Sequence, residues 1–175
     1  VALEDFKARI DQLNAVKQQQ QPTFRQATEQ DLPQLVKLRW DFRAEDGEVS
    51  TMSEEEFQQT FWRQLHNHLE GGAWVFWVAV ENEQIVSHIF LQIIESIARP
   101  TRLDNRFGYI TNVYTKPDYR GQGIGAMLMR CVIEQAAQQD LELLLVWPSE
   151  TSTNFYKRAG FQFANDVMKL QLRDY

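Results

Sequence analysis

The stretch YITNVYTKPDYRGQGIG, residues 109–125, joins a strand-like apolar run to three alternating glycines. Beyond it, Ile124, Leu128 and Val132 recur at helical spacing, which predicts a helix over residues 123–139. Glycine lets the backbone approach a ligand closely, and the N–H groups at a helix N-terminus favour phosphate. The stretch therefore predicts a strand followed by an anion-binding turn.

Two other interpretations of the glycines compete with this one. A tight turn without a ligand is disfavoured, because three alternating glycines weaken a helix start unless bare backbone is needed there. A dinucleotide fingerprint, G-x-G-x-x-G/A, is satisfied by residues 121–126. However, residues 116–120 separate the glycines from the strand, and Asp140 and Glu142 open the next strand, whereas the fingerprint needs an acid at its end.

A second segment, WPSETSTNFYKRAGF at residues 147–161, narrows the choice. Residues 109–125 resemble motif A of the GNAT superfamily of N-acetyltransferases, whose Arg/Gln-x-x-Gly-x-Gly/Ala signature begins here at Arg120. Residues 147–161 resemble motif B of that family, with its Phe-Tyr-x-x-x-Gly-Phe ending. The two motifs occur in the family's order, with one helix and one strand between them.

The resemblance implies both a fold and a donor. The fold is α/β, with a mixed, mostly antiparallel twisted sheet, a V-shaped splay between the fourth and fifth strands, and flanking helices. The donor is acetyl-CoA as co-substrate, with its pantetheine arm against the strand at residues 109–115 and its pyrophosphate in the glycine turn. The residues expected to bind it are Val113, Tyr114, Thr115, Arg120, Gly121, Gln122, Gly123, Ile124, Gly125, Ala126, Ser149 and Asn154.

The resemblance further implies that Tyr156 is the general acid for the leaving thiolate. A tyrosine with a pKa of about 10 keeps its proton at pH 7. The alternative is a packed aromatic residue that follows Phe155. Lys157 and Arg158 either contact coenzyme phosphates or are simply solvated.

The sequence does not identify a general base. Relatives that carry a carboxylate on the splayed strand would have it at Thr111 or Asn112, and neither residue is acidic. His88 alternates with apolar neighbours, which favours a hydrogen-bonded core histidine over a base. What remains is a water chain or an acid of the first helix and loop, namely Asp41, Glu45, Asp46 or Glu48. Asp41 and Glu45 share a helix face opposite Leu38 and Phe42, which favours a solvated face over a base.

Composition limits the function classes. The chain has 175 residues, 43% of them hydrophobic, and a formal net charge of −6, which disfavours nucleic acid as a partner. No apolar run reaches the roughly 18 residues of a membrane span, so no membrane association is expected. The single cysteine, Cys131, suggests a reducing, cytoplasmic compartment. His66 and His68 lack an acid or cysteine at ligand spacing, so we expect no metal site.

Periodicity and turn residues predict the elements. We expect an N-terminal helical arm and linker over residues 1–22 and an acetyltransferase domain over 23–175. The arm either packs on this domain or pairs with a partner chain, which leaves a homodimer open. Further helices are expected after residue 31, from Ser53 to Gly71, and at 123–139 and 151–159. Strands are expected at residues 23–27, 74–80, 84–97, 109–115, 141–147, 161–163 and 167–172.

Together these features predict an acetyl-CoA-dependent N-acyltransferase. The expected acceptor is a primary amine of a small molecule, which the acidic residues would favour as a cation. Two alternatives stay open. One is acetylation of a protein amine. The other is a catalytically silent CoA-binding regulatory module, since no base is identified.

Overall fold

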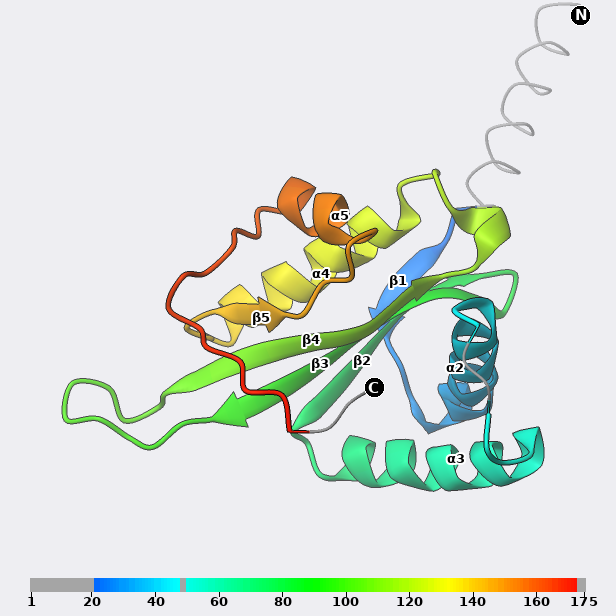
Figure 1. Cartoon of the computed structure of the whole chain (residues 1–175), viewed down its shortest axis with the longest axis horizontal. Helices are drawn as coiled ribbons and strands as arrows, with labels where there is room; N and C mark the ends of the chain where they lie inside the picture. The colour runs from blue at the N-terminus through cyan, green and yellow to red at the C-terminus, as the bar shows by residue number, and fades with distance from the viewer. Residues whose placement is uncertain (1–20, 48–49, 173–175) are drawn as a thin grey trace, which may run out of the picture.

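The computed structural model describes residues 21–47 and 50–172, which form one twisted sheet with helices on both faces (Figure 1). One face is covered by α2 (Leu32–Glu45) and α3 (Glu54–Glu70). The other is covered by α4 (Ile124–Gln138) and α5 (Thr153–Arg158). The expected α/β fold with a mostly antiparallel sheet is therefore confirmed. Residues 1–20 of the expected N-terminal arm lie outside the described residues.

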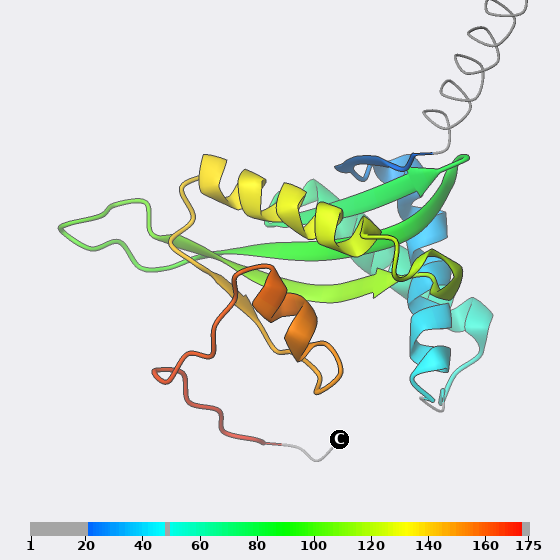
Figure 2. The ribbon, with the colours of Figure 1, turned by 90° about the horizontal axis from the view of Figure 1, so that it is seen from above.

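The strands lie in the sheet in chain order: β1 (Thr23–Gln26), β2 (Trp74–Glu81), β3 (Gln84–Glu95), β4 (Arg106–Thr115) and β5 (Leu144–Val146). The first four are antiparallel to their neighbours, whereas β5 runs parallel to β4. A parallel pair needs a crossover connection, and α4 provides it. Figure 2 shows α4 lying along one face of the sheet.

Local chemistry fixes where α3 begins. The Ser53 hydroxyl accepts a hydrogen bond from the Glu56 N–H at 3.2 Å, and the Glu56 carboxylate accepts one from the Ser53 N–H at 3.0 Å. This reciprocal capping box satisfies two donors that the first helical turn would leave unpaired. The helix start predicted from the Ser-Glu-Glu-Glu run is confirmed.

The sheet separates two apolar cores. On the α2 and α3 side, helix leucines pack on the sheet residues Phe76, Val78, Phe90 and Tyr114. On the α4 and α5 side, Leu128, Met129 and Val132 of α4 pack on Ile89, Leu91 and Ile110. Burial on both faces explains why β3 is apolar along most of its length. No helix in the described parts of the chain is long and apolar enough to cross a membrane.

Two strand predictions are wrong, and a third is too long. Residues 161–163 and 167–172 are not strands in the structure, and Phe163, Met168 and Leu170 are exposed. Their alternating pattern predicts a strand, but a ladder also requires a neighbouring edge, and this segment runs across the molecule without pairing (Figure 1). The strand expected at 141–147 shortens to Leu144–Val146 and is half-buried, because no strand in the described chain covers its outer edge.

Candidate active site

The fourth and fifth strands separate soon after they meet. Their pairing covers only Gly108–Ile110 against Leu144–Val146. Beyond these residues β5 turns toward α5, while β4 continues to Thr115 (Figure 1). The predicted splay between the fourth and fifth strands is confirmed. It leaves the second half of β4, residues 111–115, without a described strand on its β5 side.

A bulge at Asn112 decides which backbone groups of β4 face this gap. The pairing with β3 passes from Phe90 opposite Thr111 to His88 opposite Tyr114, so β4 carries one extra residue. Asn112 takes a φ of 50°, in the left-handed region. An extra residue of this kind is the defining feature of a β-bulge, which bends a strand and re-aims its groups.

The bulge reverses the direction of the backbone groups that follow it. Before the bulge, the Gly108 N–H donates toward β5, at 2.9 Å from the Leu143 carbonyl. After the bulge, the Lys116 N–H donates toward β3, again at 2.9 Å. Because successive residues direct their backbone groups to opposite sides, Val113 and Thr115 face the gap. The Thr115 carbonyl there accepts a side-chain hydrogen bond instead of a strand partner, at 2.9 Å.

The glycine turn follows directly, at the start of α4. Gly121 and Gly123 have φ values of 75° and 81°, which favour glycine strongly. A Cβ at Gly125 would lie 3.2 Å from the Thr115 hydroxyl, so this position needs a bare backbone for packing. Gly123 supplies no side-chain cap, and the N–H groups of residues 124–126 have no acceptor within the helix. The turn is therefore a backbone cradle that fits a phosphate group.

The Arg120 side chain is held by protein groups. Its Nη1 lies 2.6 Å from Glu45 Oε1, and its Nε donates to the Thr115 carbonyl at 2.9 Å. The guanidinium also lies over the Tyr114 ring, whose hydroxyl donates to Glu45 at 3.1 Å. Arg120 lowers the pKa of Glu45, whereas burial raises the pKa of Tyr114 to about 12. The backbone N–H of Arg120 is also bonded within the turn, to the Pro117 carbonyl at 3.1 Å.

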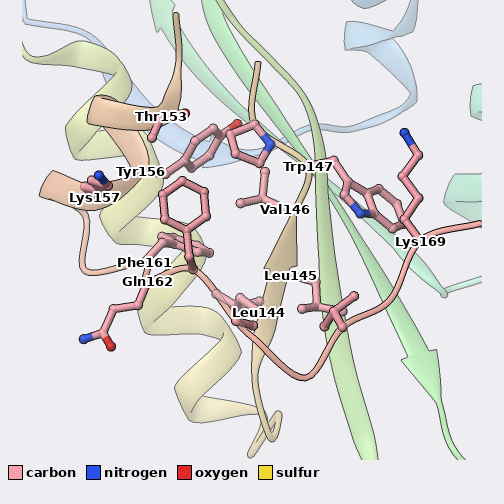
Figure 3. A pocket seen from close by; sticks show the side chains of 14 residues that line it. Leu144, Leu145, Val146, Trp147, Thr153, Tyr156, Lys157, Phe161, Gln162 and Lys169 are labelled. Carbon is pink, nitrogen blue, oxygen red and sulfur yellow. The ribbon is translucent and has the colours of Figure 1, made fainter. Parts of the chain in front are cut away.

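Tyr156 lies on α5, in the same apolar cluster as Ile110 of β4 and Ile124 of α4. It is 7% exposed and packs edge-on against Phe155 and Phe161. Figure 3 shows its ring directed from α5 toward Val146 of β5, in the wall of a cavity of about 290 Å³. Burial, with a smaller contribution from Tyr109, raises its pKa to about 12. The phenol is therefore protonated at neutral pH.

The remaining predicted coenzyme residues lie at the start of α5. The Ser149 hydroxyl is within 3.1 Å of the Thr151 and Ser152 hydroxyls, in the turn that precedes the helix. Asn154 is exposed on the first turn. Lys157 is also exposed, and its ammonium group lies 5.1 Å from the centre of the Phe163 ring. Ser149 and Asn154 thus lie at the start of the helix that carries Tyr156, whereas Lys157 lies in its last turn.

The candidate bases in the described chain are all ion-paired. Asp41 pairs with Lys37, Asp46 pairs with Arg43, and Glu45 pairs with Arg120. Glu48 lies outside the described residues. Arg120 holds the pKa of Glu45 below its usual range, which makes this carboxylate a weaker proton acceptor, and the ion pairs engage the other two carboxylates.

The sequence did not reveal one polar cluster beside the bulge. Arg39 Nη1 of α2 donates to Asn112 Oδ1 at 2.8 Å, and His88 lies beside this pair with no exposed surface. The sequence predicts a hydrogen-bonded core histidine. Burial is confirmed, but neither ring nitrogen has a hydrogen-bond partner among the described residues. A histidine in an apolar strand was the available signal, but the Arg39–Asn112 pair beside it joins two elements that are distant in the chain.

Comparisons with known proteins agree with this geometry. Among curated proteins, the uncharacterized N-acetyltransferase ycf52 of Gracilaria tenuistipitata var. liui is 29% identical over 97 residues, 53% of each chain. Glucosamine 6-phosphate N-acetyltransferase of Trypanosoma brucei brucei is 32% identical over 72 residues, 41% of this chain and 49% of its own. The matched region thus spans about half the length of these curated relatives.

Solved structures extend the similarity to the whole fold. A predicted acetyltransferase from Clostridium acetobutylicum, crystallised with acetyl-CoA, superposes with a TM-score of 0.72 at 28% identity, covering 86% of this chain and 96% of its own. A GCN5-related N-acetyltransferase from Ralstonia eutropha JMP134 gives 0.69 at 25% identity, covering 86% and 98%. The model of the acetyltransferase (GNAT) family matches residues 32–161. This match includes more than half of the chain, and the protein therefore belongs to the GNAT acetyltransferase family.

Proposed function

We propose that the protein transfers the acetyl group of acetyl-CoA to a primary amine of a small molecule. One observation supports this proposal: the glycine cradle, the end of β4 and the helix that carries Tyr156 pack together where β4 and β5 separate. A binding module alone would need the cradle but not a buried, protonated phenol beside it. We also propose that residues 23–175 form the transferase domain and residues 1–22 a separate arm.

Most of the groups proposed to bind acetyl-CoA belong to the backbone. In this proposal the N–H groups of residues 121–126 hold the pyrophosphate, and the gap-facing groups of Val113 and Thr115 pair with the pantetheine amides. Tyr114 contributes chiefly through its ring, which packs between Arg120 and Phe42. Ser149 and Asn154 add hydrogen bonds from the start of α5. Acetyl-CoA supplies the activated thioester.

The chemistry is nucleophilic acyl transfer. The amine nitrogen forms a bond to the acetyl carbon and loses a proton, while the carbon–sulfur bond breaks and the sulfur gains one. The Val113 N–H is directed into the gap, where it can stabilise the oxyanion that forms between these steps. The Tyr156 hydroxyl donates to the departing sulfur, and the proton released from nitrogen restores the balance. The products are an amide and free coenzyme A thiol.

The proposal also includes a route for the amine proton and a class of acceptor. We propose that water carries the proton away from the amine, since the described carboxylates of α2 and its following turn are ion-paired. A small amine is supported by a curated relative named for glucosamine 6-phosphate. Acetylation of a protein amine and silent coenzyme binding are the competing functions.

Release of coenzyme A thiol separates these functions. The chain is incubated with acetyl-CoA and, in separate reactions, glucosamine 6-phosphate, an aminoglycoside, spermidine and a lysine-containing peptide. We expect at least one small amine to accelerate thiol release above the rate with acetyl-CoA alone, and mass spectrometry to find that amine acetylated. Acceleration by the peptide alone would favour a protein substrate. If acetyl-CoA binds and no amine accelerates release, the silent module is the better account.

A further inference from the structure

The bulge in β4 depends on a residue that does not adopt its geometry freely. Asn112 is a non-glycine residue with a φ of 50°. The left-handed conformation costs an L-residue roughly 1–2 kcal/mol, less for asparagine than for most others. Surrounding contacts must therefore hold it, and the contacts that the structure shows come from its side chain.

Arg39 fixes the orientation of the Asn112 amide. Its Nη1 donates to Asn112 Oδ1 at 2.8 Å, so the amide oxygen faces α2. The amide nitrogen, which can only donate, is then directed away from the guanidinium. That nitrogen is buried and has no hydrogen-bond partner among the described residues. A buried donor left unpaired costs about 1–3 kcal/mol, so it needs an acceptor close by.

His88 is the neighbouring group able to accept. It lies opposite Tyr114 at the point where the register shifts, has no exposed surface, and packs between the Phe90 and Tyr114 rings. Its two ring nitrogens are likewise buried and without a partner among the described residues. The Asn112 amide is close enough to influence the imidazole. Behind the bulge, Asn112 and His88 thus contribute three buried polar atoms that have no hydrogen-bond partner among the described residues.

The imidazole is neutral in this position. Burial lowers the pKa of His88 to about 3, Arg39 acts in the same direction, and the Asn112 amide only partly opposes them. A neutral imidazole has one nitrogen that accepts and one that donates. Its accepting nitrogen can take the amide N–H of Asn112.

We propose that His88 is a positioning residue for acetyl transfer, which acts with Arg39 to hold Asn112 and so to fix the bulge that directs the Val113 N–H at the thioester carbonyl. This inference rests on the proposed function, because it assigns the placement of the oxyanion donor. His88 itself touches neither the coenzyme nor the amine. The proposed interactions run from α2 through the Asn112 side chain to β3. They orient the N–H of Val113, one residue further along β4.

A role in packing alone makes a different prediction. Replacing a buried, unsatisfied ring by an apolar side chain of similar size is nearly neutral or stabilising. If His88 only fills space, His88→Leu keeps both stability and catalysis. If His88 positions the bulge, His88→Leu keeps stability but loses catalysis. Asn112→Gly complements this variant, because glycine adopts the positive φ without strain but has no amide to hold.

The test uses the full chain and acetyl-CoA labelled with ¹³C at the thioester carbonyl. In the wild type we expect the bound carbonyl stretch to lie below its value in free acetyl-CoA, because a directed N–H weakens the bond. His88→Leu and Asn112→Gly should return it toward the free value, with a kcat loss of about 10-fold or more and little change in KM for acetyl-CoA. His88→Gln, which keeps an acceptor, should retain most of the wild-type shift.

The outcomes are separable. Wild-type carbonyl frequency and kcat in both His88→Leu and Asn112→Gly would overturn the positioning role. If His88→Leu does not fold, Asn112→Gly alone decides, since it leaves the imidazole in place. A wild-type chain that does not bind labelled acetyl-CoA would instead contradict the proposed function itself.

Discussion

The Arg120 guanidinium and the Glu45 carboxylate meet at 2.6 Å, which joins the turn before α4 to the last residue of α2. The two residues are 75 positions apart in the chain, and they place the coenzyme cradle beside the loop that leaves α2. Arg120 also donates to the Thr115 carbonyl at the end of β4. One side chain thus connects the strand, the cradle and the helix around the proposed site.

Glu45→Gln tests whether Glu45 is a structural partner or the base. Both side chains are more than a third exposed, so we expect the loss of the pair to cost about 1 kcal/mol or less in the free energy of unfolding. A released Arg120 should raise the Kd for acetyl-CoA by a few-fold. A general base would be lost outright, and a fall in kcat of about 100-fold or more would assign that role to Glu45.

Alanine substitutions at two glycines with positive φ can separate effects on acetyl-CoA binding from effects on folding. Gly123 and Gly160 have φ values of 81° and 98°, and open space surrounds both positions. Alanine at either one should destabilise the fold by about 1–2 kcal/mol. Only Gly123→Ala should also weaken acetyl-CoA binding, measured by calorimetry, because Gly160 lies outside the cradle. Equal affinities in the two variants would mean that residues 121–125 do not contact the coenzyme.

Tyr156→Phe tests whether Tyr156 is the general acid. The ring and its packing remain, so stability should change little, while kcat should fall by about 100-fold or more. Tyr109→Phe is the matched control and should keep its rate, although Tyr109 also influences the pKa of Tyr156.

The pH profile gives a second readout for Tyr156. Because its pKa is raised to about 12, the phenol stays protonated where an ordinary tyrosine, with a pKa of about 10, ionises. We therefore expect no fall in kcat between about pH 8 and about pH 10.5. A decline centred near pH 10 would contradict a raised pKa for the group that donates the proton.

His88 should also affect how the free energy of unfolding depends on pH in the acid range. The imidazole takes up a proton near pH 6.5 in the unfolded chain but only near pH 3 in the folded protein. The unfolded state therefore binds more protons between these values, and stability falls as the pH drops through that window, by about 1.4 kcal/mol per pH unit. Arg39 and Tyr114 face the ring and keep their charge states throughout this window, so they do not contribute to the slope.

Denaturant titrations from pH 7 to pH 4 measure this slope. His88→Leu should be less sensitive to acid than the wild type by that amount. Identical slopes would mean that the imidazole is not held neutral in the folded protein. Acids such as Asp31, whose pKa is also lowered, are present in both proteins and cancel in the comparison.

The sequence predicts the elements whose determinants are local. The capping box at Ser53 and Glu56 marks the start of α3, and the three glycines mark the start of α4, because both signals lie within a few residues of the helix they begin. The splay between the fourth and fifth strands was expected only through the family resemblance. Nothing in the apolar run 141–147 indicates that its pairing would stop after Val146.

The features that the sequence misses depend on partners that are distant in the chain. Residues 167–172 alternate like a strand, yet they have no ladder partner among the described residues. The bulge at Asn112 is visible only against the register of β3, and the Glu45–Arg120 pair only once α2 is packed beside β4. The role of Tyr156 as general acid and the coenzyme contacts remain predictions that rest on the resemblance. The domain boundary remains a prediction from periodicity and turn residues.

Binding of acetyl-CoA tests the central claim most directly. A ligand at about 100 times its Kd adds roughly 2.7 kcal/mol to the free energy of unfolding of a protein that binds it only when folded. For a chain of this size we expect a rise in Tm of about 5–10 °C with saturating acetyl-CoA, reduced in Gly123→Ala but preserved in Gly160→Ala. A Tm that does not move at millimolar acetyl-CoA would contradict the account.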